Sequence, residues 1–286
     1  MKLFLLIILF FINSSVFACS CFVNVLLDKI QNSEFIAKIK VLKVSEPTSD
    51  GEYQNAEIEV LELFKGNNIK SIKIYSNLNT SCNLIVSENT TWLVFANNDK
   101  SGLMQFGYCS GSIQLDRKFD LEKYPNVESN WKNSIDRKIA LLRYFKSKNI
   151  RNPNEYNLQI KSISLSRDRF KGFEVNNEKF AVYELMVEKD LTISKIKTLQ
   201  AFDNQKLSDS LMSFLKENKI ASKKGKSVIK KRIRMIVVYY YYPAEENNQS
   251  FISGGVKMLQ NYSQTAKDRR FIKGKTIWEF DNNNRG

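Results

Sequence analysis

Four cysteines, two of them beside a predicted cleavage site, are the residues of this sequence best suited to chemistry. They are Cys19, Cys21, Cys82 and Cys109, and the chain contains no histidine. A chain without histidine has no histidine-based catalytic triad, no histidine-ligated metal site and no histidine general base. No Cys-x-x-Cys pair occurs, so the sequence does not predict a zinc ribbon.

The first 18 residues have the pattern of a secretory signal peptide. Lys2 precedes an apolar run over residues 3–12, and a polar-to-small segment then ends in Val16-Phe17-Ala18. The run is shorter than the roughly 20 residues that span a bilayer. We therefore expect cleavage after Ala18, export, and an environment in which disulfides persist. Two alternatives stay open, namely an uncleaved anchor and a loose lipobox that would place a lipid on Cys19.

Cleavage after Ala18 would make Cys19 the new amino terminus. An α-amine has a pKa near 8, so a sizeable neutral fraction exists at neutral pH. The neutral amine and the adjacent carbonyl oxygen can form a five-membered chelate around a divalent metal. Such a terminus would fit the open coordination site of a metal that another protein holds.

Disulfide bonds would hold this terminus in place. Four cysteines allow three pairings, and a Cys19–Cys21 bridge would close a strained ring, so we discount it. The two remaining pairings both attach the segment 19–21 to Cys82 and Cys109. Each bridge would close a long loop, which is worth about 4 kcal/mol on chain-entropy grounds. An end of the chain that normally frays would then be rigid.

The charge of the chain, +14 in total, is unevenly distributed. Residues 19–120 carry 10 Lys and Arg against 12 Asp and Glu, whereas residues 121–286 carry 33 against 18. All four cysteines lie in the near-neutral part. We therefore expect a domain over 19–120, after the signal peptide 1–18. The expected export makes nucleic acid an improbable partner for the basic part.

Hydrophobic alternation in residues 19–120 indicates a small β domain. We expect a helix over 22–30 and five strands, over 33–44, 56–64, 69–75, 91–96 and 103–108. This number of strands is compatible with a five-stranded OB-fold barrel. The fold class predicted for the whole chain is mainly β plus α+β.

The basic part is predicted to begin with a helical linker over 121–155, whose apolar residues recur at helical spacing between 127 and 148. A ββαβ module over 156–243 follows, with strands over 158–165, 180–187 and 193–198, a helix over 204–218, and a strand over 228–242. We expect 244–286 to be a polar tail that is loosely ordered apart from one short helical or strand segment.

The amino-terminal part resembles the tissue inhibitors of metalloproteinases (TIMPs), whose mature chains begin with Cys-x-Cys. Cys19-Ser20-Cys21 carries this resemblance, together with Phe35-Ile36-Ala37-Lys38-Ile39, Leu63-Phe64-Lys65-Gly66, the segment 72–75 leading to Cys82, and Thr91-Trp92-Leu93-Val94-Phe95-Ala96 followed by Cys109. The resemblance covers about 100 residues and implies an OB-fold with bridges Cys19–Cys82 and Cys21–Cys109.

The resemblance also implies roles for individual residues. The amine and carbonyl of Cys19 would chelate the zinc of a target metalloendopeptidase, and Ser20 would point into its specificity pocket. Thr80, Ser81 and Cys82 would add contacts, and Cys21 completes the target-binding segment. The implied activity is inhibition by binding, without a cofactor of the protein's own.

The carboxy-terminal part resembles the TonB carboxy-terminal domain. The hairpin over 180–197 carries this resemblance, together with Lys224-Gly225-Lys226-Ser227-Val228, while Leu191 and Ser227 replace the family's glycine and proline. The resemblance implies a bacterial, envelope-facing module that captures peptides by strand addition. Seven of the thirteen residues 222–234 are Lys or Arg, which suits either a guarded strand edge or contact with an anionic envelope surface.

These observations lead to two hypotheses. The first is a secreted or cell-envelope binding protein that inhibits a zinc metalloendopeptidase. The alternative is a structural or transport-associated envelope protein, either free or lipidated, that binds peptides or envelope polymers. No motif sets acidic, basic or hydroxyl side chains at a recognisable catalytic spacing, so we do not expect an enzyme.

Overall fold

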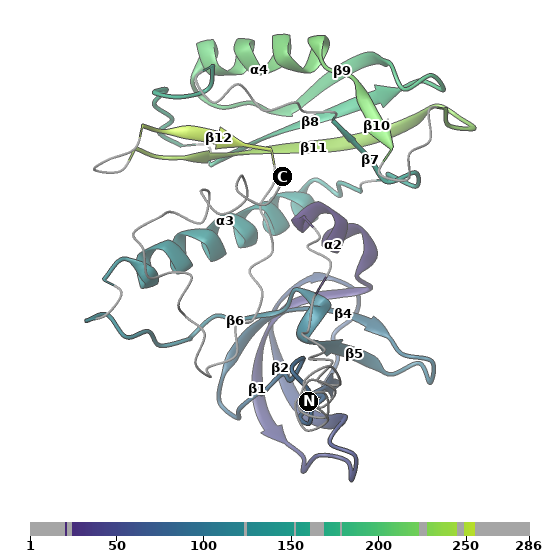
Figure 1. Ribbon diagram of the computed structural model, residues 1–286, viewed down its shortest axis with the longest axis vertical. Helices are drawn as coiled ribbons and strands as arrows, with labels where there is room; N and C mark the ends of the chain where they lie inside the picture. Colours follow the sequence, from purple (N-terminus) through teal and green to yellow (C-terminus); the bar gives the residue numbers. More distant parts are fainter. Residues whose placement is uncertain are drawn as a thin grey trace, which may run out of the picture. The chain divides into compact units, whose positions relative to one another are not determined.

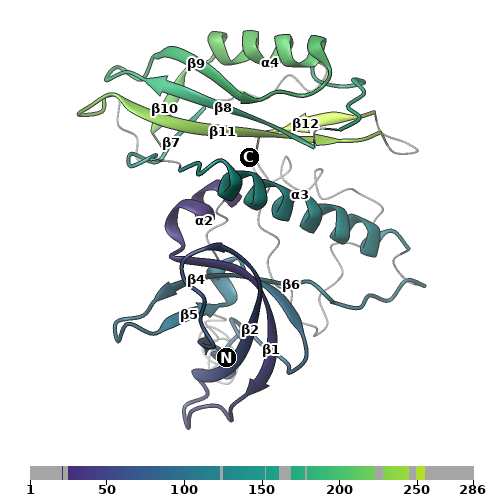
Figure 2. The ribbon, with the colours of Figure 1, turned by 180° about the vertical axis from the view of Figure 1, so that it is seen from behind.

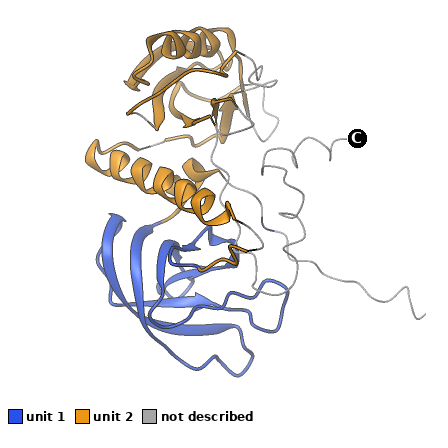
Figure 3. Cartoon of the chain, turned by 90° about the vertical axis from the view of Figure 1, so that its left-hand side faces the viewer, with its two compact units in different colours: residues 1–23, 34–117, 259–286 blue, residues 24–33, 118–258 orange. Residues whose placement is uncertain are grey.

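The computed structural model describes residues 21, 25–122, 125–151, 153–160, 169–177, 179–222, 228–244 and 249–254. They fall into two compact units (Figure 3). Unit 1 contains Cys21 and residues 34–117, and unit 2 contains residues 25–33 and the described residues from 118 onward. The predicted signal peptide, Cys19 and Ser20 lie outside the described residues. The fold is mixed α/β.

Unit 1 is a closed five-stranded β-barrel, as the sequence predicts, and is consistent with an OB-like barrel. Its five strands are hydrogen-bonded in the closed order β1-β2-β3-β5-β4-β1, and β4 also pairs with the short strand β6, Ile113–Gln114. All neighbours are antiparallel except β3 and β5, which are parallel. The strands curl around a common interior in both Figure 1 and Figure 2. Their bounds are β1 Phe35–Val44, β2 Tyr53–Lys65, β3 Ser71–Tyr75, β4 Thr91–Asn98 and β5 Met104–Gly107.

The barrel interior follows from alternation along the strands. Phe35, Ala37, Ile39 and Val41 of β1 are at most 1% exposed. These residues meet Trp92 and other apolar side chains from β2, β3, β4 and β5 in one core. The β1–β2 ladder has three register shifts, which are irregularities of the kind that bend a strand and help a sheet to close.

Unit 2 contains a four-stranded sheet of order β12-β11-β8-β9 between two helices, α3 and α4 (Figures 1 and 2). On one side, α4 packs into a core with alternate residues of β8 and β11, including Leu207, Leu211, Tyr183 and Tyr239. On the other side, Tyr144 of α3 donates a hydrogen bond to the Leu199 carbonyl, 2.9 Å away. The bounds are α3 Val127–Ser147, β8 Phe180–Val187, β9 Ile193–Gln200, α4 Gln205–Glu217, β11 Ile233–Tyr242 and β12 Phe251–Ser253.

The ends of α4 explain its length. Asn204 accepts a hydrogen bond from the Leu207 amide at 3.0 Å, which satisfies a free amide at the start of the helix. At the other end, the side chain of Asn218 donates to the Phe214 carbonyl at 2.7 Å. The predicted helix over 204–218 therefore includes both capping residues.

Several element boundaries differ from the prediction. The first helix is α2, Leu26–Asn32, rather than 22–30. The last long strand begins at Ile233 rather than at 228, because β8 ends opposite Ile233 and the Ile229 amide bonds to the Lys189 carbonyl instead. The predicted strand over 158–165 is described only as β7, Leu158–Ile160, and residues 161–168 lie outside the described part. Two short strands were not predicted, namely β6 Ile113–Gln114 and β10 Ile220–Ser222, whereas β12 lies in the tail 244–286, where one short helical or strand segment was expected.

The β8–β9 hairpin turns at Leu191, which has the left-handed φ of 67° that favours glycine. Its amide bonds to the Glu188 carbonyl at 3.0 Å, and its side chain is 8% exposed in the core of unit 2. Burial of the leucine therefore offsets the backbone strain at this turn. Of the helices within the described ranges, none is both long and apolar enough to cross a membrane.

Candidate functional site

The parallel pair β3 and β5 places two chain segments at one end of the barrel. Tyr75, the last residue of β3, lies opposite Gly107, the last residue of β5. A Cβ atom on Gly107 would lie 3.0 Å from the Cβ of Tyr75, so glycine allows the close approach. Because the strands run in the same direction, the segments that follow them leave the barrel at the same end. These segments contain Thr80, Ser81 and Cys82 after β3, and Cys109 after β5.

A disulfide joins Cys21 to Cys109, with a Cα–Cα distance of 5.3 Å. Cys109 lies in the 3₁₀ turn η1, Tyr108–Ser110, directly after β5. This is the pairing that the TIMP resemblance implies. The bond attaches a residue from the start of the predicted mature chain to the end of the barrel where β3 and β5 finish.

The segment between β3 and β4 is a closed loop rather than an extended crossing. At its base, the Leu84 amide donates to the Ser76 carbonyl at 2.8 Å, and Ser76 and Leu84 are both buried. We call residues 77–83 the connector loop. Because its two ends are hydrogen-bonded to each other, the loop projects from the end of the barrel in a defined position.

Hydrogen bonds inside the connector loop fix the predicted contact residues. The Thr80 hydroxyl donates to the Asn77 carbonyl at 3.0 Å and accepts from the Cys82 amide at 3.1 Å. Thr80 and Ser81 are exposed, and Cys82 is half-buried and disulfide-bonded. Cys19, the partner that the resemblance implies for Cys82, lies in the part of the chain that the structure does not describe.

Of the six predicted target-binding residues, the structure therefore places four. Cys21 is bonded to Cys109, directly after β5. The connector loop, which contains Thr80, Ser81 and Cys82, starts after the neighbouring strand β3. Cys19 and Ser20, the predicted chelating and pocket-directed residues, fall outside the described ranges. Within those ranges, no three Cys, Asp or Glu side chains gather in a way that could hold a metal ion.

A group of two tyrosines and one lysine at the end of β3, where the connector loop starts, was not predicted. The rings of Tyr53 and Tyr75 lie 5.3 Å apart on β2 and β3, and the Lys73 ammonium lies 4.0 Å above the Tyr53 ring. Lys73 also forms an ion pair with Asp99 at 2.9 Å. The Ser101 hydroxyl and this ammonium hold the pKa of the Asp99 carboxyl well below its usual range. The β2–β3 register brings Tyr53 and Tyr75 together, and the β3–β5 pairing brings Lys73 near the turn that carries Asp99; a single sequence shows neither register.

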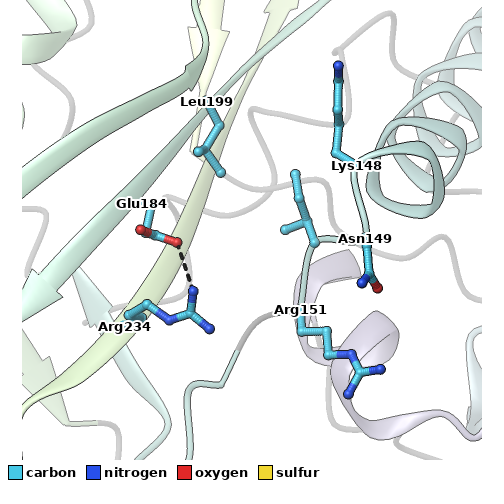
Figure 4. A pocket seen from close by; sticks show the side chains of 7 residues that line it. Lys148, Asn149, Arg151, Glu184, Leu199 and Arg234 are labelled. Atoms are coloured by element: carbon cyan, nitrogen blue, oxygen red, sulfur yellow. Dashed lines mark hydrogen bonds and ion pairs between the residues drawn. The ribbon is translucent and has the colours of Figure 1, made fainter.

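Unit 2 contains a second candidate, a pocket of about 370 Å³ between the end of α3 and the sheet. The charged residues that line it are Lys148, Arg151, Glu184 and Arg234 (Figure 4). Lys148 and Arg151 lie in the predicted helical linker 121–155, and no role was predicted for any of these four residues. No protein-family model and no curated protein sequence matches this chain.

Proposed function

We propose that the protein is an exported binding protein that inhibits a zinc metalloendopeptidase through its mature amino terminus. The Cys21–Cys109 disulfide carries this proposal, because it holds the residue two positions after Cys19 at one end of the barrel. The connector loop leaves the barrel at the same end. Together they would present a rigid, two-part surface to a target, with little ordering entropy lost on binding.

The chemistry of the proposal depends on Cys19. Its neutral amine and its carbonyl oxygen would fill open positions on the target's zinc, where water or substrate otherwise binds. Ser20 would enter the adjacent specificity pocket of the enzyme. Thr80, Ser81 and Cys82 would contact the rim of the same cleft, and the TIMP-like OB-fold would serve as the rigid support.

Intact-mass and amino-terminal analysis of the exported protein tests the starting condition. The proposal expects a chain that begins at Cys19 with a free α-amine and an oxidised thiol. A lipid on Cys19, an acylated amine or an uncut leader would contradict it, because each removes the chelating pair.

A second candidate is a non-inhibitory envelope protein that binds peptides through the TonB-like module. One observation favours it. β9 is an outer strand of its sheet, and among the described strands only β8 pairs with it. Such an edge can accept an added strand, although the exposed Lys195 and Lys197 of β9 are of the type that guards edges against unwanted pairing. Capture of an extended peptide by a chain with a blocked Cys19 amine would favour this candidate over the first.

A further inference from the structure

Helix α3 of unit 2 carries a hydroxyl and an amine in direct contact. Ser134 and Lys138 are four positions apart, so they are neighbours on one side of the helix. The Lys138 Nζ lies 2.6 Å from the Ser134 Oγ and 3.3 Å from the Ser134 carbonyl oxygen. Among the described residues, the amine hydrogen-bonds to Ser134 alone, so the two side chains form an isolated pair.

The surroundings of Lys138 favour the neutral amine. Its side chain is fully buried, and no described carboxylate forms an ion pair with it. Because an ammonium without an opposite charge is unfavourable away from water, burial lowers the pKa of Lys138 to about 7. Repulsion by Arg137 adds to this effect, and within the described ranges no other charged group shifts this pKa. A large fraction of the amine is therefore neutral at neutral pH.

A neutral Lys138 has a lone pair that can take the Ser134 proton. An ammonium can only donate to the hydroxyl, whereas a neutral amine can accept the hydroxyl proton and still donate to the Ser134 carbonyl. A hydroxyl with a base in hydrogen-bond reach is an activated nucleophile. Ser134 is half-buried, so part of this residue meets solvent while the base stays out of it.

An aromatic pair lies one helical turn before Ser134. The rings of Trp131 and Phe119 are 5.6 Å apart in an edge-to-face arrangement, and both residues are half-buried. Trp131 precedes Ser134 by three positions, so these two residues are also neighbours on the helix surface. Aromatic surface beside the hydroxyl favours a reagent whose reacting group is attached to a short apolar chain over one that carries a charge there.

We propose that Ser134 is a site of covalent acylation by activated esters and thioesters of short apolar acids, with Lys138 as the general base. The donor must carry a good leaving group, because the pair supplies only a nucleophile and a base. The site belongs to unit 2 and does not depend on Cys19 or on a target enzyme.

The reaction transfers one acyl group. The Ser134 oxygen attacks the acyl carbonyl carbon while its proton passes to the Lys138 nitrogen. The bond from this carbon to the leaving oxygen or sulfur then breaks, and the Lys138 ammonium gives the proton to the leaving group. Ser134 is left as an ester, and Lys138 is again a neutral amine.

Reaction of the full mature chain with p-nitrophenyl butyrate, followed by peptide mass spectrometry, tests the proposal. Ser134 should gain a butyryl group, and Ser134→Ala should gain none at this position. Lys138→Met should slow acylation of Ser134 by about a hundredfold, as expected for loss of a general base. In the unchanged protein the rate at Ser134 should rise with pH and level off above about pH 8, once the Lys138 amine is neutral. Thermal unfolding of each variant verifies that the fold is retained.

The same helix offers matched controls. Ser129 and Ser147 are exposed, and each hydroxyl donates to the backbone carbonyl three positions earlier, at 3.1 and 3.0 Å, rather than to a base. They should stay unmodified although they are more accessible than Ser134. Lys132 is an exposed amine of α3 and reports direct acylation of lysine. The rate of that reaction should still rise above about pH 9, as for ordinary lysines, and Lys132→Met should leave the rate at Ser134 unchanged.

Four results would overturn the proposal. The first is no butyryl group on Ser134. The second is an equal rate in Lys138→Met and in the unchanged protein, which would show that Lys138 is not the base. The third is acylation of Ser129 or Ser147 as fast as that of Ser134, which would show that the reaction follows exposure alone. The fourth is a rate at Ser134 that keeps rising with pH as the rate at Lys132 does.

Discussion

Cys21 and Cys109 are 88 positions apart in the sequence, yet a disulfide holds their Cα atoms 5.3 Å apart at the end of the barrel. Cys109 follows β5 directly, and β5 pairs with the strand that leads into the connector loop. The bond therefore attaches Cys21, two positions after the predicted cleavage product's first residue, to the end of β5 in unit 1. Cys21 itself therefore has a defined position at the end of the barrel from which the connector loop starts.

Removing this disulfide should weaken the barrel and release the terminus together. Closing a loop of 88 residues is worth about 4.6 kcal/mol on chain-entropy grounds, so the double change Cys21→Ser with Cys109→Ser should lower the free energy of unfolding by about that amount. Urea denaturation measures the loss. An unchanged midpoint would show that unit 1 does not depend on the bond.

The stability of unit 1 should depend on Gly66, directly after β2. It has a φ of 89°, and a Cβ atom there would lie 2.8 Å from the Glu34 carbonyl oxygen. Gly66→Ala should therefore lower the free energy of unfolding by about 2 kcal/mol or more, since both the backbone and the clash oppose it.

Gly102 is the matched control for this change. Its φ of 83° is similar, but nothing lies within 4 Å of the position that a Cβ atom would take. Gly102→Ala should cost only about 1 kcal/mol, from the left-handed backbone alone. Equal losses in the two variants, measured by thermal unfolding, would show that the close contact with β1 has no energetic role.

Thr80→Val should loosen the connector loop while leaving the barrel folded. The change removes the hydroxyl that donates to the Asn77 carbonyl and accepts from the Cys82 amide, with an expected cost of about 1 kcal/mol in stability. Binding to a target metalloendopeptidase should weaken as well, because Thr80 is exposed on the proposed surface.

Thr91→Val makes the same chemical change elsewhere in unit 1. The Thr91 hydroxyl makes no hydrogen bond to the other described residues, although the backbone amide bonds to Asp116. Target binding should stay as in the unchanged protein. If Thr91→Val weakened target binding as much as Thr80→Val does, the connector loop would have no specific role in binding.

The buried Lys138 should give the protein an unusual dependence of stability on pH. Its side chain is fully buried on α3 and donates to the Ser134 hydroxyl at 2.6 Å. Burial, aided by the nearby Arg137 guanidinium, lowers the pKa of Lys138 to about 7. Between this value and the pKa near 10.4 of an exposed lysine, the unfolded chain binds more protons than the folded one. Stability should therefore rise with pH across this range, by up to about 1.4 kcal/mol per pH unit.

Urea denaturation of Lys138→Met from pH 6 to pH 9 isolates this contribution. The variant should be more stable than the unchanged protein at pH 6, and the difference should shrink as the pH rises. Lys132→Met, at an exposed position of the same helix, should keep the original dependence. A difference between Lys138→Met and the unchanged protein that stays constant over this range would contradict the lowered pKa.

The sequence predicted those features that depend on short-range pattern. The alternation from Phe35 to Val41 located β1, and the spacing of Leu207, Leu211 and Phe214 located α4, because one face of each element is buried. The five-stranded closed barrel was also predicted, and a closed barrel is what the structure contains.

Features that depend on tertiary context could not be predicted. The strands β6 and β10 are two and three residues long and form only where a partner strand is already in place. The pair Arg234 and Glu184 is 50 positions apart in the sequence, and only the β8–β11 register brings the two side chains together. The burial of Lys138 could not be predicted from the sequence, because its neighbours on α3 include charged residues of the kind that are usually exposed.

The most direct test of the proposed function compares two forms of the protein against a panel of zinc endopeptidases. One form begins at Cys19, and the other carries a single alanine before Cys19, which moves the amine away from the Cys19 carbonyl. The account predicts that the first form inhibits at least one enzyme and that the second is weaker by about a hundredfold or more, because the chelating pair is lost. Equal inhibition by both forms, or none by the form that begins at Cys19, would contradict it.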